Sequence, residues 1–188
     1  MGMKRIERDF VTLFNYLWYK DFPVDEAAGL ANRANWTIHM GLVIRQCANL
    51  LGARALFESG GRTDAVLQYS DHDILTFVEW EWKRAHADIN EIKKLRSKAS
   101  KAAFQTFIGY SRAEDVHAAL SETLSTWVDA EIPLIYFLIT YDVVKGNRHF
   151  DKLVTYEFSR NRHKKIRSQP ALPWMVNRKK FIEAEENT

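Results

Sequence analysis

Glu79, Glu81 and Lys83 occupy alternate positions of the run VEWEWK, with a tryptophan in each gap. In an extended strand, residues two apart share one face and lie about 6–7 Å from each other. The three charged side chains therefore project together, and the tryptophans belong to the opposite face. Alternating charges can simply decorate an exposed antiparallel sheet, where each charge pair contributes under about 1 kcal/mol. The preceding run ILTFV, however, favours a central and covered strand, on which charges are rare unless they are paired or bind a metal.

A fourth charged residue, Asp64, lies on the preceding strand candidate, and the polar segment SDHD offers a turn between the two strands. A hairpin closed near 70–72 brings Asp64 alongside the glutamates. Several carboxylates in one patch repel each other and hold protons unless a cation neutralises them. Mg²⁺ suits such a patch because it takes carboxylate oxygens and keeps several waters. The pattern therefore predicts a Mg²⁺ (or Mn²⁺) site.

The elements that must position these residues follow from apolar spacing and turn signals. We expect helices within 5–22, 36–51, 87–102 and 113–128, strands at 54–59, 62–70, 73–83, 104–111 and 132–143, a further helix at 149–159 and an extended segment at 168–174. The order from residue 36 onward is helix, strand, strand, strand, helix, strand.

This order, with an aspartate on the second strand and Glu-x-Lys on the third, resembles the PD-(D/E)xK nuclease superfamily over residues 36–110. The resemblance implies an α/β fold with a restriction-endonuclease-like αβββαβ core, in which helices flank a central mixed sheet and a C-terminal helix and strand are added. It implies that Asp64 and Glu81 bind the metal and that Lys83 positions the attacking water. If Glu79 is the ligand instead, the signature becomes the Glu-x-Glu variant, so both glutamates remain candidates.

The C-terminal region 145–180 carries eleven lysines and arginines but only two acids, which is typical of a surface that binds polyanions. We treat 145–188 as a basic extension of a single domain spanning 1–188. A solvated tail is the alternative interpretation. The candidate nucleic-acid-binding residues are Arg45, Lys93, Lys94, Arg160, Arg162, Lys164, Lys165 and Arg167.

Several functional classes find no support in the sequence. The one cysteine excludes an intramolecular disulfide, and the six histidines lack metal-binding spacing. No glycine-rich phosphate loop or Gly-x-Ser-x-Gly elbow occurs. No secretory signal or run of about 20 apolar residues is present, so we expect a cytoplasmic protein without membrane contact. The sequence predicts a metal-dependent DNA nuclease, as a homodimer if it cuts both strands; the alternative is an inactive nucleic-acid-binding or protein-interaction module of the same fold.

Overall fold

The computed structural model describes residues 3–23, 33–59, 63–84, 89–144 and 147–176 of the 188-residue chain. Its helices are α1 (Arg5–Leu17), α2 (Arg33–Leu50), α3 (Ile89–Ser97) and α4 (Val116–Thr126). Its strands are β1 (Arg54–Ser59), β2 (Thr63–Ser70), β3 (Asp73–Arg84), β4 (Phe104–Arg112), β5 (Leu134–Val144), β6 (Asn147–Ser159) and β7 (Arg162–Pro170). Short 3₁₀ helices lie at η2 (Ala99–Lys101), η3 (Ala113–Asp115) and η4 (Pro173–Met175).

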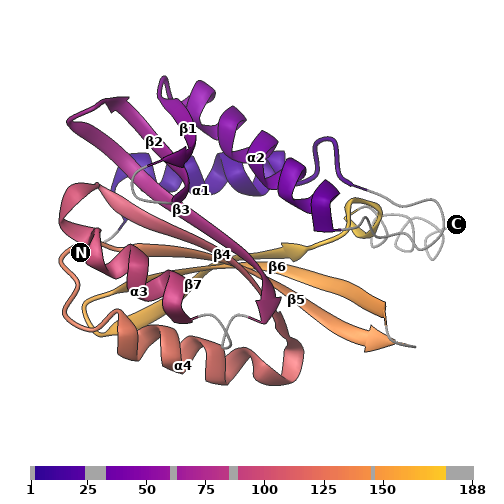
Figure 1. Cartoon of the computed structure of the whole chain (residues 1–188). Coiled ribbons are helices and arrows are strands. Elements are labelled where there is room, and N and C mark those ends of the chain that lie inside the picture. The colour runs from indigo at the N-terminus through magenta and orange to yellow at the C-terminus, as the bar shows by residue number, and fades with distance from the viewer. Residues whose placement is uncertain (1–2, 24–32, 60–62, 85–88, 145–146, 177–188) are drawn as a thin grey trace, which may run out of the picture.

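The strands form one mixed sheet in which the spatial order is the chain order, β1 to β7 (Figure 1). The β1–β2–β3 and β5–β6–β7 segments are antiparallel, whereas β3, β4 and β5 run parallel. A parallel pair needs a crossover connection, and α3 and α4 lie in the two crossovers. The sequence-based expectation of a mixed sheet flanked by helices is confirmed.

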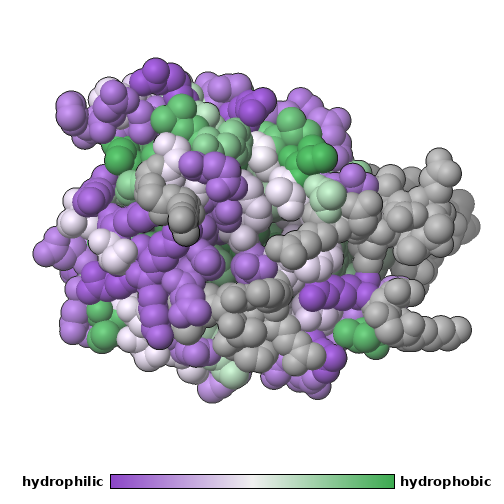
Figure 2. Space-filling model, viewed as in Figure 1, coloured by the Kyte–Doolittle hydropathy of each residue, from purple (hydrophilic) through white to green (hydrophobic). Residues whose placement is uncertain are grey.

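Helices cover both faces of the sheet, with α1 and α2 on one face and α3 and α4 on the other (Figure 1). Each face has its own core. On the α1/α2 face, the rings of Phe14 and Phe137 stack with their centroids 3.7 Å apart. On the α3/α4 face, Ile92 and Leu95 of α3 pack in a cluster with Phe107 of β4. The surface over α3 and α4 is largely hydrophilic, and apolar patches lie over α2 and β1 (Figure 2).

Helix α1 is fastened to the far end of the chain by buried polar contacts. The indole Nε1 of Trp18 donates to the carbonyl of Ala171 at 2.7 Å, and the amide of Gln169 donates to the carbonyl of Asn15 at 2.8 Å. The Asn15 amide in turn donates to Thr155 Oγ1 on β6 at 3.0 Å. These contacts satisfy polar groups that would otherwise be buried without partners.

Strand β3 is internal, as its composition predicts. Val78 is fully buried, and Trp80 and Trp82 are half-buried against the core on the α1/α2 face. The side chain of Glu79 points to the opposite face and is only 2% exposed. The observed order α2–β1–β2–β3–α3–β4 matches the element order expected for residues 36–110.

The helix expected at 149–159 is wrong, because this segment is part of β6. Phe150, Leu153, Val154 and Phe158 fit helical spacing, but the structure buries Leu153 and Val154 on opposite faces of the sheet. A strand covered on both sides buries consecutive residues, so its pattern does not alternate. The basic segment is correspondingly no simple tail, since β6 and β7 complete the sheet; residues 177–188 lie outside the described part.

Candidate functional site

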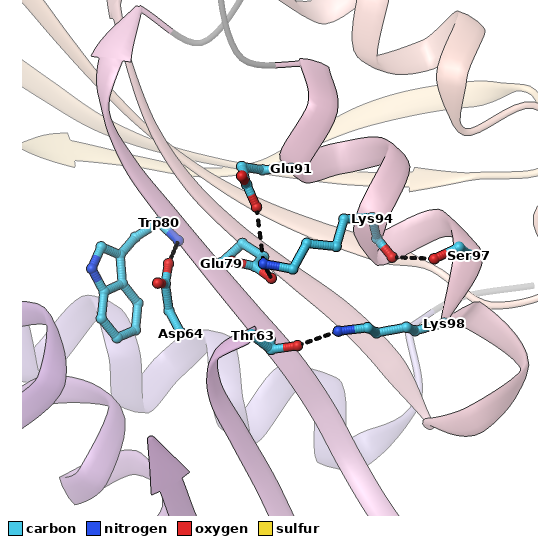
Figure 3. A network of polar contacts seen from close by, with 8 residues as sticks. All are labelled: Thr63, Asp64, Glu79, Trp80, Glu91, Lys94, Ser97 and Lys98. Carbon is cyan, nitrogen blue, oxygen red and sulfur yellow. Dashed lines mark hydrogen bonds and ion pairs between the residues drawn. The ribbon is translucent and has the colours of Figure 1, made fainter. Parts of the chain in front are cut away.

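The β2–β3 hairpin brings Asp64 and Glu79 together. The antiparallel register pairs Ala65 with Val78, and continuing it by one residue places Asp64 opposite Glu79. Asp64 Oδ2 accepts a hydrogen bond from the backbone N–H of Trp80 at 2.7 Å, which fixes the carboxylate against β3 (Figure 3). Two carboxyl groups from adjacent strands therefore share the α3/α4 face of the sheet.

Helix α3 supplies a cation to this pair. Lys94 Nζ lies 2.6 Å from Glu79 Oε1 and 3.3 Å from Glu91 Oε2, so the ammonium group is held between the strand and its own helix (Figure 3). The position of Lys94 depends on the burial of Ile92 and Leu95, which press α3 against the sheet. Lys98 lies one turn further along and donates to Thr63 Oγ1 on β2.

The electrostatics of the pair are those of desolvated carboxyl groups. Burial raises the pKa of Glu79 to about 8; Lys94 opposes this shift through its hydrogen bond, and the charge of Asp64 adds to it. Burial also raises the pKa of Asp64, partly offset by the Trp80 amide. Burial lowers the pKa of Lys94, but Glu79 and Glu91 together raise it by more. The pKa is therefore raised overall, and the ammonium form is favoured.

The pair fits a partly hydrated divalent cation. Mg²⁺ is usually bound through one or two carboxylates together with waters and substrate phosphates. Asp64 and Glu79 supply two such carboxylates, and because burial raises the pKa of both groups, a bound cation would stabilise their charged forms. Among the described residues, no group of three or more Asp, Glu, His or Cys side chains could hold a metal. Further ligands would therefore have to come from water, substrate or backbone.

The remaining motif residues lie further along β3. Glu81 is half-buried and is two positions beyond Glu79, on the same side of the strand by alternation. Lys83 belongs to β3, but its side chain lies outside the described part of the structure. The glutamate placed opposite Asp64 is thus Glu79, the one that the Glu-x-Lys register does not use.

The predicted nucleic-acid-binding residues are distributed over several elements, and among them Lys94 of α3 contacts Glu79. Arg45 lies on α2 across the sheet, with its guanidinium 5.1 Å from the centroid of the Phe57 ring. Lys93 is exposed on α3, beside Lys94. Among the strongly basic residues 160–167, Arg160 is in the turn before β7 and four lie on β7, namely Arg162, Lys164, Lys165 and Arg167.

Strand β7 is remote from the carboxylates. Three strands separate it from β3, and with neighbours about 4.8 Å apart this corresponds to roughly 19 Å along the sheet. Arg162 and Lys164 line a pocket with Arg8 of α1, so they also lie on the other face. These two basic residues and the carboxylates therefore lie on opposite faces of the sheet.

Sequence reasoning missed the role of the helix that follows β3. The sequence predicts that Lys94 contacts a nucleic-acid backbone, and it gives no role to Glu91 or Lys98. Their spacing carries a signal, because positions 91, 94 and 98 are three and four residues apart and lie on one side of a helix. A row of basic residues on one side of the helix that directly follows the strand with carboxylates indicates that the helix places a cation beside them.

No protein-family model matches the chain, and no curated protein matches it. Among solved structures, the YaeQ protein from Pseudomonas syringae is similar with a TM-score of 0.33 and 10% identity, covering 74% of this chain and 80% of that one. The YaeQ protein from Xanthomonas axonopodis pv. citri has a TM-score of 0.28 and 10% identity, covering 70% and 79%. Similarity of this degree identifies neither a family nor an activity for this chain.

Among the described helices, none is long and apolar enough to cross a membrane.

Proposed function

We propose that this protein is a Mg²⁺-dependent nuclease that hydrolyses DNA phosphodiester bonds, with α2 to β4 forming a restriction-endonuclease-like core. The observation that carries the proposal is the convergence of Asp64, Glu79 and Lys94 from three successive elements on one desolvated surface. Two carboxylates beside an ammonium group suit the transfer of a negatively charged phosphoryl group, which needs a metal and a fixed positive charge.

The chain's own residues have distinct roles in this proposal. Asp64 and Glu79 would hold the cation, which supplies Lewis-acid polarisation of the phosphate and activation of water when it is bound. Lys94 would leave Glu79 to face the phosphate and the attacking water, so it would take the role that the Glu-x-Lys pattern gives to Lys83. The Trp80 amide keeps Asp64 in place throughout.

Adjacent lysines on α3 provide a direct test. We expect Lys94→Met to lower the rate of plasmid nicking in Mg²⁺ by about 100-fold, the usual scale for loss of one stabilising charge. Lys93→Met removes the same charge from an exposed position of α3 and should lower the rate far less than Lys94→Met does. Asp64→Asn and EDTA should each abolish nicking. Equal activity of the two lysine variants, or nicking that persists in EDTA, would sink the assignment.

One observation favours a second candidate, a nucleic-acid-binding module without catalysis. The ammonium of Lys94 lies 2.6 Å from Glu79 Oε1, so a positive charge is already present beside this carboxyl group without a metal. This candidate predicts salt-dependent DNA binding that Mg²⁺ does not change, and no nicking by any variant. Binding and nicking measured on the same preparation separate the two candidates.

A further inference from the structure

A cleft lies beside the carboxylates, between η2 and the β1–β2 hairpin. Helix α2 packs against β1 and β2 on one face, whereas α3 packs against β3 and β4 on the other. The cleft has a volume of ≈ 440 Å³, within the range of small-molecule pockets. Its lining residues are Ser59, Val66, Gln68, Ile74, Phe77, Lys98 and Lys101.

The cleft combines an apolar floor with a polar rim. Val66 and Phe77 are nearly fully buried, and Ile74 is half-buried beside them. Lys98 lies over the Phe77 ring, with its ammonium 5.3 Å from the ring centroid. The Gln68 amide donates to Asp71 at 2.9 Å and leaves its carbonyl oxygen as an acceptor. A flat, partly polar group suits this mixture better than an alkyl chain or a lone ion does.

Three lysines connect the cleft to the carboxylates. Lys94 contacts Glu79, Lys98 reaches Thr63 and lines the cleft, and Lys101 lines its outer part. Lys94 lies on α3, Lys98 lies in the turn that follows, and Lys101 ends η2, so the three lysines follow one another along this stretch of chain. A chain of phosphates running from the carboxylates to the cleft would therefore meet positive charge at each step.

We propose that this cleft is a subsite for one unpaired nucleoside that flanks the phosphate at Asp64 and Glu79, so that the substrate is single-stranded or locally opened DNA. The proposal rests on the proposed function and deepens it. The base would take the place of the Lys98 ammonium over the Phe77 ring, and Lys98 and Lys101 would then hold its phosphate. A base stacked and paired in a duplex cannot enter such a cleft, because binding requires it to leave the helix.

Small probes test the subsite without cleavage. We would titrate the full chain in EDTA with thymidine 3′,5′-bisphosphate and with 1,2-dideoxyribose 3,5-bisphosphate, which lacks the base, and follow backbone amide shifts by NMR. Shifts should cluster at Ser59, Gln68, Phe77 and 98–101. Loss of the base should weaken binding about tenfold, the scale of one base-stacking contact. Equal affinities, or shifts confined to β7, would overturn the subsite.

Two lysine variants and a comparison of single-stranded with duplex DNA complete the test. Lys101→Ala should weaken bisphosphate binding about fivefold, and Lys152→Ala, an exposed control on β6, should not. A labelled 10-nucleotide single strand should bind at least five times more tightly than its duplex. An unchanged Lys101 variant, or equal or tighter duplex binding, would contradict the proposal. Binding in the cleft without nicking would refute only the nuclease, whereas nicking without binding there would refute only the subsite.

Discussion

At the scale of single residues, the candidate site depends on how a buried charge is compensated. Glu79 is almost completely removed from solvent, and the hydrogen bond and charge of Lys94 oppose the cost of ionising it. Burial raises the pKa of Glu79 to about 8, so a cation that binds this group at neutral pH has to displace a proton. The raised pKa distinguishes Glu79 from a solvated glutamate on an exposed sheet face, which is the alternative interpretation of the charged strand.

His39 provides a prediction about pH at the same scale. It is 2% exposed and packed edge-on against Trp18 and Trp36, and burial lowers its pKa from 6.5 to about 4. The unfolded chain therefore binds more protons than the folded one between these values. The stability from neutral His39 is fully present above pH 6.5 and is lost as pH falls towards 4, by roughly 3 kcal/mol at most.

The measurement is the free energy of unfolding of wild type and His39→Phe between pH 8 and 4. Below pH 6.5, the free energy of unfolding of wild type should fall relative to that of His39→Phe. Glu7 and Asp64, whose pKa values burial raises, have the opposite pH dependence, but they are common to both proteins and cancel in the difference. A difference that stays constant over this range would contradict the burial of a neutral imidazole.

At the scale of elements, two glycines should respond to alanine in opposite directions. A Cβ on Gly109 in β4 would lie 2.8 Å from Phe107 Cε1 and 3.0 Å from the Tyr136 hydroxyl, and both rings are fully buried. A Cβ on Gly41 in α2 would make an ordinary 3.7 Å contact with Phe57. Thermal or urea unfolding should show Gly109→Ala destabilised by about 1–3 kcal/mol and Gly41→Ala stabilised by about 0.5–1 kcal/mol. Equal effects would mean that β4 is not packed as described.

The elements also show how far sequence could predict the site. The β2–β3 hairpin is local, so alternation and a turn near 70–72 predict that Asp64 lies beside the glutamates, but they leave Glu79 and Glu81 both open as its neighbour. The contribution of Lys94 depends on which side of α3 faces the sheet, and this is set by the burial of Ile92 and Leu95. The position of the basic segment could not be predicted, because β6 buries residues on both faces and resembles a helix in its apolar spacing.

At the scale of the whole molecule, positive charge is distributed over separate surfaces. Arg162 and Lys164 of β7 lie with α1, away from the lysines of α3. We therefore expect the double variant Arg162→Ala/Lys164→Ala to bind an 8-nucleotide single strand within twofold of wild type in fluorescence anisotropy. A loss above fivefold would mean that short DNA binds at β7, against the placement proposed here.

The anchoring of α1 has a consequence for the order in which the molecule is completed. Each strand pairs with its immediate predecessor in the chain, so the sheet can grow strand by strand during synthesis. Helix α1 leaves the ribosome before the described strands, yet Asn15 and Trp18 make hydrogen bonds to the late residues Thr155, Gln169 and Ala171. These polar contacts must therefore wait for β6 and β7, whereas the apolar side of α1 packs on β4 and β5. A nascent chain that stalls before β6 would leave Asn15 and Trp18 without these late partners, in an incomplete state that is more exposed to chaperones or to aggregation.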